Sequence, residues 1–304
     1  MKKSVRILLS VLCALMCLCL PLLLCAPVSL AEETGAAKAL PVDFSAGSVP
    51  DPDGWTEEGY SDETITVRLE TRDEDGVIWR IIYVDIAHPS QLRTATAGKL
   101  NSSKVAKPSS MAEGKNAVVA INGDYFSNDP NKTTFEYRQG EKIRSKTNKK
   151  KDLLIIDAEG NFHTFIKCGA EGKAALEKYI AEGGTIMDAF TFGPVLVQEG
   201  NRLTMDKNYG YNPNGREPRA AIGQMGELSY VLVVAEGRSS DSDGVTHQEL
   251  ADFMFELGCS EAFNLDGGNS ATLIFHGGFY MNRTASSERA QSDIIYFASA
   301  RDAE

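Results

Sequence analysis

The sequence predicts an α+β fold, in which a mixed but largely antiparallel sheet packs against a few helices in one folded domain. Runs of β-branched and aromatic residues, separated by short Gly-, Asn- and Asp-containing turns, predict several hairpins. Two segments have the periodicity of helices. There is no internal repeat, and strands and helices do not alternate along the whole chain as they do in parallel α/β folds.

The strands are predicted from their composition and from the turns between them. Residues 64–70 alternate apolar and polar side chains, residues 77–86 form a longer β-branched and aromatic run, and the Asp-Glu-Asp-Gly segment at 73–76 joins the two as a hairpin. Ala-Glu-Gly-Asn at 158–161 joins another pair. The remaining strands are expected at residues 117–121, 153–157, 162–166, 228–235, 262–265, 271–275 and 294–297.

Two helices are predicted. Residues 170–182 form the first, which ends at a pair of glycines. The second is marked more clearly, because Thr246 and Glu249 have the spacing of a capping box and Gly258 has the place of a C-terminal stop. Its apolar residues recur at the spacing of one helix face: Leu250, Phe253, Met254 and Leu257.

The amino terminus has the pattern of an export signal. Three basic residues precede an apolar stretch at 7–25, and Ser-Leu-Ala at 29–31 offers a cleavage site. We expect cleavage after Ala31, which places the protein in the cell envelope or outside the cell. Retention of residues 7–25 as a membrane anchor and lipidation at Cys25 are the alternatives. Residues 32–62 are expected to be a tether or irregular leading segment, and residues 63–304 the folded domain.

The charge balance bears on possible partners. With 31 Lys and Arg against 42 Asp and Glu, the net charge is −11 and the pI about 5.0, which argues against a nucleic-acid partner. Between Arg138 and Lys151, however, there are seven basic residues and one acidic residue. This basic stretch is interpreted either as a solvated loop between two strands or as a contact surface for an anionic polymer.

Two cysteines, Cys168 and Cys259, lie outside the predicted signal. In an exported chain they could form a disulfide, which would stabilise the fold by about 4 kcal/mol in the chain-entropy model. Two buried free thiols are the alternative, and the sequence does not choose between them.

Residues suited to chemistry occur at four places where predicted strands end. They are the segments 122–126, 193–200, 217–223 and 264–270, which combine Asn, Gly, Asp, Glu and Arg. Strand ends hold a side chain firmly and still leave it accessible to a ligand. Each segment alone is also compatible with an ordinary turn.

Together these segments resemble the phosphodiester glycosidase family. The matching motifs are AINGDYF at 120–126, FGPVLVQEG at 192–200, PRAAIG at 218–223 and NLDGGNSATL at 264–273, and the resemblance covers roughly residues 77–297. The chain departs from the family pattern at Asn269 and Asp124, where many relatives have glycine. The resemblance implies a single catalytic domain that cleaves a sugar from a phosphodiester, releasing free sugar and a phosphomonoester.

Residue type and position assign roles within these motifs. A guanidinium binds phosphate oxygens bidentately, and a carboxylate stabilises positive charge that develops at an anomeric carbon. We therefore expect Asp266 at the anomeric carbon, with Glu236 or Asp124 as the base for water. The phosphate ligands would be Arg219, Arg238 and Arg289. The groups that hold other substrate oxygens would be Asn122, Gly267, Gly268 and Ser270. These roles predict that the turns near residues 122, 219 and 266 converge in three dimensions into one pocket that pairs guanidinium with carboxylate.

The sequence implies no cofactor, and the substrate would be a sugar phosphate or anionic glycan of the envelope or of an exopolysaccharide. Two other functions remain open: a non-catalytic protein that binds anionic glycans, and a metal-dependent phosphodiesterase. The candidate oxygen ligands for a metal would be Asp124, Asp241, Asp243 and Asp266. The four histidines show no paired ligand spacing, and His247, in the first turn of the capped helix, is expected to face solvent.

Overall fold

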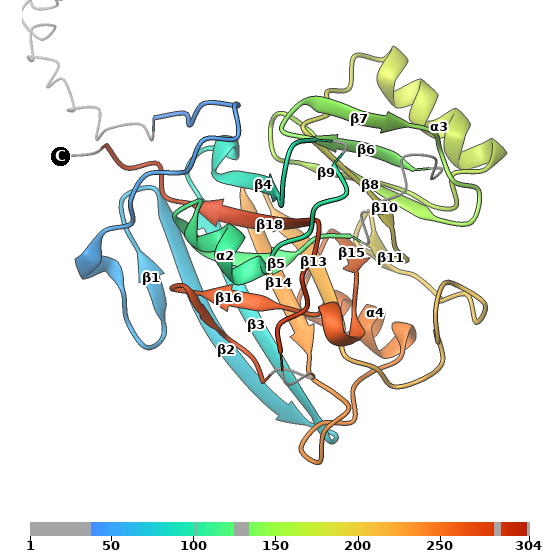
Figure 1. Cartoon of the computed structure of the whole chain (residues 1–304). Coiled ribbons are helices and arrows are strands. Elements are labelled where there is room, and N and C mark those ends of the chain that lie inside the picture. Colours follow the sequence, from blue (N-terminus) through green and yellow to red (C-terminus); the bar gives the residue numbers. More distant parts are fainter. Residues whose placement is uncertain (1–37, 101, 125–133, 283–286, 303–304) are drawn as a thin grey trace, which may run out of the picture. The chain divides into compact units, whose positions relative to one another are not determined.

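The computed structural model describes residues 38–100, 102–124, 134–282 and 287–302, all within the compact unit Ala37–Glu304. The predicted export signal at 1–31 lies outside the described residues. About 40% of the described residues are in strands and 15% in helices, and the strands form three sheets (Figure 1). Every strand pair recorded within the described residues is antiparallel. The prediction of a largely antiparallel arrangement with a few helices in one domain is confirmed. The prediction of an α+β fold with a mixed sheet was wrong, because the fold is mainly β and no parallel strand pair is recorded among the described residues.

The largest sheet has eight strands and contains the long hairpin that the turn at 73–76 predicts. Its strands, in spatial order, are β1 (Gly59–Ser61), β2 (Ile65–Glu74), β3 (Val77–Ile86), β14 (Ser229–Ala235), β13 (Arg219–Gly226), β15 (Glu261–Leu265), β11 (Val195–Gln198) and β12 (Asn201–Arg202). The central strands β13 and β14 are apolar and largely buried, as expected of strands that are covered on both faces.

The other two sheets have five strands each. One consists of β7 (Glu141–Ser145), β6 (Phe135–Arg138), β10 (Asp188–Phe192), β8 (Asp152–Ile156) and β9 (Phe162–Phe165). The other consists of β17 (Gly278–Phe279), β16 (Leu273–Phe275), β5 (Ala117–Asn122), β18 (Asp293–Ala298) and β4 (Leu92–Thr96). Of these strands, the sequence did not predict β4, β6, β7, β10 or β17, because all five are short and the first four contain charged residues.

The main hydrophobic core lies where the three sheets meet. Ile82 of β3, Ile121 of β5 and Leu154 of β8 each come from a different sheet, are fully buried, and belong to one cluster. On the other face of the eight-stranded sheet, Trp79 stacks on Phe253 with ring centroids 3.7 Å apart. This second cluster fixes the capped helix against the sheet.

The described residues contain three α-helices: α2 (Pro108–Glu113), α3 (Ala170–Ala181) and α4 (His247–Glu256). The capping box of α4 is confirmed, since the Thr246 hydroxyl accepts from the Glu249 backbone N–H at 3.1 Å and Glu249 Oε2 accepts from the Thr246 N–H at 2.8 Å. Gly258 follows the helix with φ +87°, as a C-terminal stop requires. Within the described residues no helix is long and apolar enough to cross a bilayer.

The leading segment is described from residue 38 onward, and it packs against the domain. It is irregular up to the 3-10 helix η1 (Pro52–Gly54), but β1 then pairs with β2, so the sheet begins at Gly59 rather than at residue 63. Tyr60 is only 2% exposed and belongs to the main core.

The two cysteines of the domain do not form a disulfide with one another. Cys168, just before α3, and Cys259, just after α4, are both buried free thiols. Burial raises the pKa of each to about 12. Both thiols are therefore protonated and unreactive at neutral pH.

Candidate active site

The predicted site segments meet because their strands are neighbours. β13 and β15 pair with Ala220 opposite Leu265, which brings the start of β13 beside the end of β15. The Gly268 N–H consequently donates to the Pro218 carbonyl at 2.7 Å. From the third sheet, Asn122 Nδ2 donates to the Asp266 carbonyl at 2.8 Å. The turns near residues 122, 219 and 266 thus converge, as the sequence predicts.

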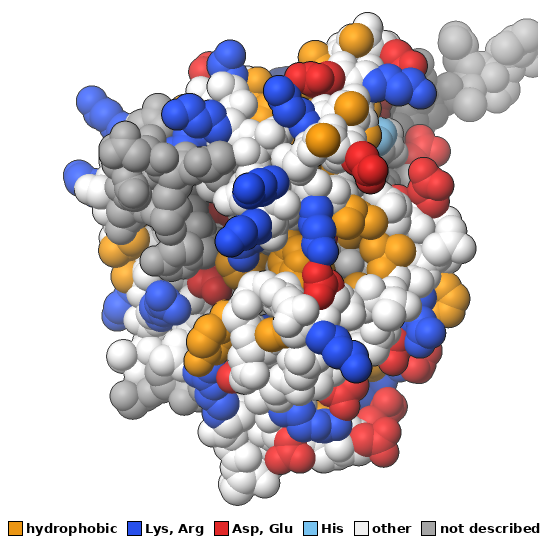
Figure 2. Space-filling view, turned by 90° about the vertical axis from the view of Figure 1, so that its right-hand side faces the viewer, with side chains coloured by type: hydrophobic (Ala, Val, Ile, Leu, Met, Phe, Trp, Pro, Cys, Tyr) orange, Lys and Arg blue, Asp and Glu red, His pale blue; other side chains and the backbone are white. Residues whose placement is uncertain are grey.

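A cavity of about 260 Å³ opens at this point, close to the lower end of the size range of small-molecule sites. Its lining contains two carboxylates, Glu217 and Asp266, and four basic residues: Lys151, Arg219, Arg238 and Arg289. Figure 2 shows Lys and Arg side chains gathered around a hollow on the face that corresponds to the right-hand side of Figure 1. The cavity has an excess of positive charge in an acidic chain, and this favours an anionic ligand.

Two glycines shape the loop that carries Asp266. A Cβ at Gly267 would lie 2.6 Å from the Pro218 carbonyl oxygen, so no side chain fits there. Gly268 has φ +59°, a conformation that glycine adopts readily, and it begins the 3-10 helix η3 (Gly268–Ser270). Both line the cavity. Their role in the site is therefore to let two backbone segments approach each other closely.

Asp266 is one of the two carboxylates that line the cavity. Burial raises its pKa, although a hydrogen bond from Ser270 and the positive charges of Arg289 and Lys151 oppose the rise. Arg289 Nη1 donates to Ser270 Oγ at 2.9 Å, which directs the Ser270 hydroxyl hydrogen toward Asp266. Arg289 and Ser270, both predicted site residues, thus lie together with Asp266.

Arg238 and Glu217 form an ion pair on the cavity wall. Arg238 Nε donates to Glu217 Oε2 at 2.6 Å, and Arg238 Nη1 donates to Asn269 Oδ1 at 3.1 Å. Burial alone would raise the pKa of Glu217, but hydrogen bonds from Asn212 and Arg238 lower it. Arg238 has φ +58° and its side chain is 40% exposed, so an incoming anion can reach it.

Arg219 lies in the cavity wall, but most of its donors are used within the protein. Its Nε donates to the Val245 carbonyl, its Nη2 to the carbonyls of Asn212 and Gly215, and its Nη1 to His247. A guanidinium has five N–H groups, so one is left for a ligand. Burial lowers the pKa of Arg219 to about 10, and it stays charged at neutral pH.

His247 does not face solvent, contrary to the prediction. It is 2% exposed, lines the cavity, and its Nε2 lies 2.9 Å from Arg219 Nη1. The loop between β12 and β13 covers the start of α4, where the His247 N–H donates to the Pro213 carbonyl at 3.1 Å. Burial, and then the charges of Arg219 and Lys151, lower the pKa of His247 to about 3.

Asn122 and Asp124 are not among the residues that line the cavity. Asn122 is fully buried and joins two loops, since its Oδ1 accepts from the Thr272 N–H at 3.0 Å while its Nδ2 donates to Asp266. It holds the cavity in shape from behind.

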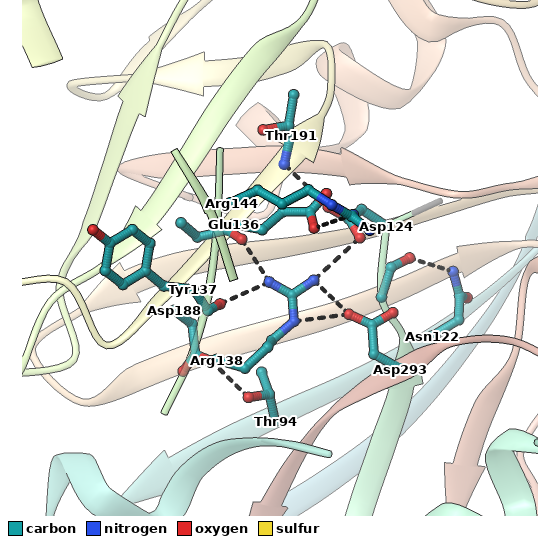
Figure 3. Close-up of polar contacts among 12 residues, drawn as sticks. Thr94, Asn122, Asp124, Glu136, Tyr137, Arg138, Arg144, Asp188, Thr191 and Asp293 are labelled. Atoms are coloured by element: carbon teal, nitrogen blue, oxygen red, sulfur yellow. Dashed lines mark hydrogen bonds and ion pairs between the residues drawn. The ribbon is translucent and has the colours of Figure 1, made fainter. Parts of the chain in front are cut away.

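Asp124 belongs instead to a buried cluster centred on Arg138 (Figure 3). Arg138 Nη2 lies 3.2 Å from Asp124 Oδ1, and Arg138 Nε donates to Asp293 Oδ2 at 2.9 Å. We call this the Arg138 cluster; it comprises Arg138, Arg144, Asp124, Glu136, Asp188 and Asp293. Burial is the main reason why the pKa values of Asp124 and Asp293 are raised, the latter to about 6.

The basic stretch is not a single solvated loop. Arg138 is fully buried at the end of β6, and residues 141–145 form β7, where Arg144 pairs with Glu136 at 2.8 Å. Lys151, at the far end of the stretch, lines the cavity and lies 4.8 Å from the centre of the Phe192 ring. The stretch therefore supplies two cations, Arg138 and Arg144, to a buried cluster of carboxylates and one, Lys151, to the cavity.

Glu236 is not among the residues that line the cavity either. It is 3% exposed, and its Oε1 accepts from Arg80 Nε at 2.6 Å and from the Asn282 N–H at 2.8 Å. These bonds occupy the carboxylate that we expected to activate water. The position of Glu236 in the sequence did not indicate that its carboxylate is bound to Arg80 and Asn282.

The cavity contains residues that the sequence did not single out as ligands: Lys151, Phe192, Tyr211, Glu217, His247 and Asn264. A signal existed for Asn264, because it precedes Asp266 by two residues and alternate strand residues share a face. The described residues include no group of three His, Cys, Asp or Glu placed to hold a metal. Asp124, Asp241, Asp243 and Asp266 thus do not form such a group.

Comparison with known proteins identifies the family. A family model for phosphodiester glycosidases matches residues 115–298, more than half of the chain. The chain therefore belongs to the phosphodiester glycosidase family. An uncharacterised prophage-derived protein of Bacillus subtilis strain 168, YomE, is 27% identical over 199 residues, which span 61% of this chain and 28% of that protein. The chain thus corresponds to little more than a quarter of this relative.

Two solved structures are similar in fold. The catalytic domain of zebrafish N-acetylglucosamine-1-phosphodiester α-N-acetylglucosaminidase, auto-inhibited by its pro-peptide, has a TM-score of 0.60 at 16% identity, covering 79% of this chain and 85% of that one. A hypothetical protein from Synechocystis has a TM-score of 0.55 at 16% identity, covering 77% and 62%. At this identity the likeness extends to the fold alone.

Proposed function

We propose that this protein hydrolyses sugar-1-phosphodiesters by breaking the bond between the anomeric carbon and a phosphate oxygen. Family membership supports the reaction class. The observation that carries the proposal is the cavity, where an excess of basic side chains surrounds Asp266, a partly shielded carboxylate with a raised pKa. The cations suit the phosphate, and the carboxylate suits the sugar.

The chemistry follows from the leaving group. When the C–O bond breaks, its electron pair stays on the phosphate oxygen, and water supplies the new hydroxyl of the sugar. A phosphomonoester leaves readily, so a carboxylic acid is less necessary than in hydrolysis of an ordinary glycoside. What the site contributes is stabilisation of the charges that develop on both fragments.

Different residues of the cavity bind the phosphate and the sugar. Arg238 and Arg289 bind the departing phosphate together with Lys151, because their side chains reach the cavity. Asp266 faces the positive charge at the anomeric carbon. The bases expected from the sequence, Glu236 and Asp124, are outside the cavity lining, and Glu217 is paired with Arg238. Asp266 therefore also orients the attacking water.

We also propose that the protein acts outside the cytoplasm, on a sugar-phosphate polymer of the envelope or an exopolysaccharide. The basis is the signal-like pattern of residues 1–31. Mass determination of the amino terminus of protein secreted from its host tests it. A chain that begins at residue 32 supports export with cleavage, and an intact terminus in the cytoplasmic fraction contradicts it.

Incubation of the purified full chain with a panel of sugar-1-phosphodiesters, with and without a chelator, tests the activity. Release of free sugar together with phosphomonoester, unaffected by the chelator, is the expected result. Tight binding without product would instead support the non-catalytic glycan-binding function. Loss of activity in the chelator, restored by a divalent cation, would support the metal-dependent phosphodiesterase.

A further inference from the structure

Two polar atoms in the cavity wall are buried without a hydrogen-bond partner among the described residues: Nδ1 of His247 and Oδ1 of Asn264. Both residues line the cavity, and they are 2% and 1% exposed. They come from different elements, since His247 begins α4 and Asn264 lies in β15. A buried polar atom is normally paired, so two such atoms at one cavity indicate a ligand that pairs with them.

The contact with Arg219 fixes the proton on the His247 ring. A guanidinium can only donate, so at 2.9 Å Nε2 must accept from Arg219 Nη1 and carries no hydrogen. The proton of the neutral ring is therefore on Nδ1. Burial, and then the positive charge of Arg219, oppose a second proton on the ring, which agrees with its low pKa. His247 thus presents a neutral N–H donor.

Arg219 is held in place independently of His247. Its other donors bind the carbonyls of Val245, Asn212 and Gly215 at 2.7 to 3.3 Å. It therefore acts on His247 as a fixed support and retains little capacity to bind phosphate.

Asn264 is oriented in a comparable way. Its Nδ2 donates to the Gly193 carbonyl at 2.9 Å, which leaves Oδ1 as the free end of the amide. The atom that remains for a ligand is therefore a neutral acceptor. It disfavours phosphate or carboxylate, whose oxygens are themselves acceptors.

We infer that His247 Nδ1–H and Asn264 Oδ1 form a hydroxyl-recognising subsite for the glycosyl unit, with Arg219 as a positioning residue. This inference rests on the proposed function for the identity of the ligand. A sugar hydroxyl both donates and accepts, and so it matches one donor and one acceptor that carry no charge. The phosphate is then left to Lys151, Arg238 and Arg289.

The proton position is tested on the full chain without any ligand. Nitrogen-15 NMR of labelled histidine, with His247→Asn to assign the signal, should show a neutral ring protonated on Nδ1 from pH 5 to 8. A ring protonated on Nε2, or one that becomes an imidazolium above pH 5, would overturn the inference. This readout does not depend on activity, so it remains informative even if the proposed reaction is wrong.

Recognition is tested by calorimetry with α-D-glucopyranosyl methyl phosphate, its N-acetylglucosamine counterpart, and their monodeoxy analogues. Removal of one particular hydroxyl should weaken binding to the wild type about 10- to 100-fold, because a site built around a hydroxyl rejects its absence. In His247→Leu or Asn264→Leu the same removal should change binding less than about threefold, since the partner is already lost.

His247→Asn is the matched control, because its amide nitrogen can replace Nδ1 as a donor and should restore part of the discrimination. Two results would contradict the subsite. One is that every deoxy analogue loses the same affinity in the wild type and in the variants; the other is that none of the probes binds. Selective binding without hydrolysis would support the subsite and contradict the proposed function, which separates the two claims.

Discussion

The cavity and the Arg138 cluster use the same residue types for opposite purposes. In the cavity, Arg238 is 40% exposed and basic residues outnumber carboxylates. In the cluster, Arg138 is 0% exposed, and four carboxylates face two arginines. Arg and Asp can serve chemistry only where a ligand reaches them; when they are enclosed they are structural. Substitutions in the cavity should therefore lower activity and leave stability almost unchanged. Substitutions in the Arg138 cluster should mainly lower stability.

The largest expected effect is the loss of turnover in Asp266→Asn. The amide keeps the shape of the side chain but cannot stabilise positive charge at the anomeric carbon, so kcat should fall by about 10³-fold or more. The midpoint of thermal unfolding should be almost unchanged. Steady-state kinetics and calorimetry measure the two quantities. An Asp266→Asn variant with wild-type turnover would remove Asp266 from the mechanism.

The next effect is on stability and occurs in the Arg138 cluster. Arg138→Met leaves buried carboxylates without their shared cation, which should lower the free energy of unfolding by about 3–5 kcal/mol. Urea denaturation measures this. Arg68→Met is the matched control, because Arg68 pairs with Glu70 on the surface with 57% of its side chain exposed, and that variant should be neutral. Equal losses of stability in Arg138→Met and Arg68→Met would contradict the distinction between the buried cluster and an exposed ion pair.

A smaller effect is expected for Arg238→Ala. Loss of a charge-assisted hydrogen bond to the departing phosphate corresponds to about 1.5–3 kcal/mol, or roughly a 10- to 150-fold fall in kcat/KM. The dependence of kcat/KM on salt should weaken at the same time, since one attractive charge has been removed. The experiment measures kcat/KM from 50 to 300 mM salt. An unchanged kcat/KM would assign Arg238 to the Glu217 ion pair alone.

The Arg138 cluster should also make the stability of the fold depend on pH. The pKa of Asp293 is about 6 in the folded chain, above its unfolded value near 3.8, so the folded state retains this proton longer as the pH rises. Stability should therefore decrease between about pH 4 and pH 6 and then level off. Asp293→Asn should flatten that decrease. A rise in stability across this range that is the same in both proteins would contradict the assignment.

The smallest effect concerns the helix that carries His247. Thr246→Ala removes the side-chain cap of α4 and should cost about 1 kcal/mol of stability, whereas Thr246→Ser should retain most of it. Urea unfolding measures both variants. If Ala and Ser behave alike, the hydroxyl does not support the helix.

The local features of the fold could be predicted from the sequence, because they depend on residues close together in the chain. The β2–β3 hairpin follows from a turn between two β-branched runs, and α4 follows from its capping box. The convergence of the loops at 122, 219 and 266 was also predicted, through motifs that resemble a family with one site.

The environments of single side chains could not be predicted in the same way. Asp124 follows a buried strand in a motif and looked catalytic, but Arg138, which pairs with it, comes from another sheet. The place of His247 in the first turn of α4 predicted a solvent-facing side chain, but the loop before β13 covers it. In each case the residue that determines the environment of the side chain is 14 or more residues away in the chain. Local sequence patterns do not determine where such a residue lies in the fold.

The central claim is that the cavity breaks the bond between the sugar and the phosphate oxygen. Turnover of a sugar-1-phosphodiester in water enriched in oxygen-18, followed by mass spectrometry of both products, tests it most directly. The account predicts that the label appears at the anomeric hydroxyl of the released sugar and that the phosphomonoester stays unlabelled. Label in the phosphomonoester would show cleavage at phosphorus and contradict the proposed role of Asp266.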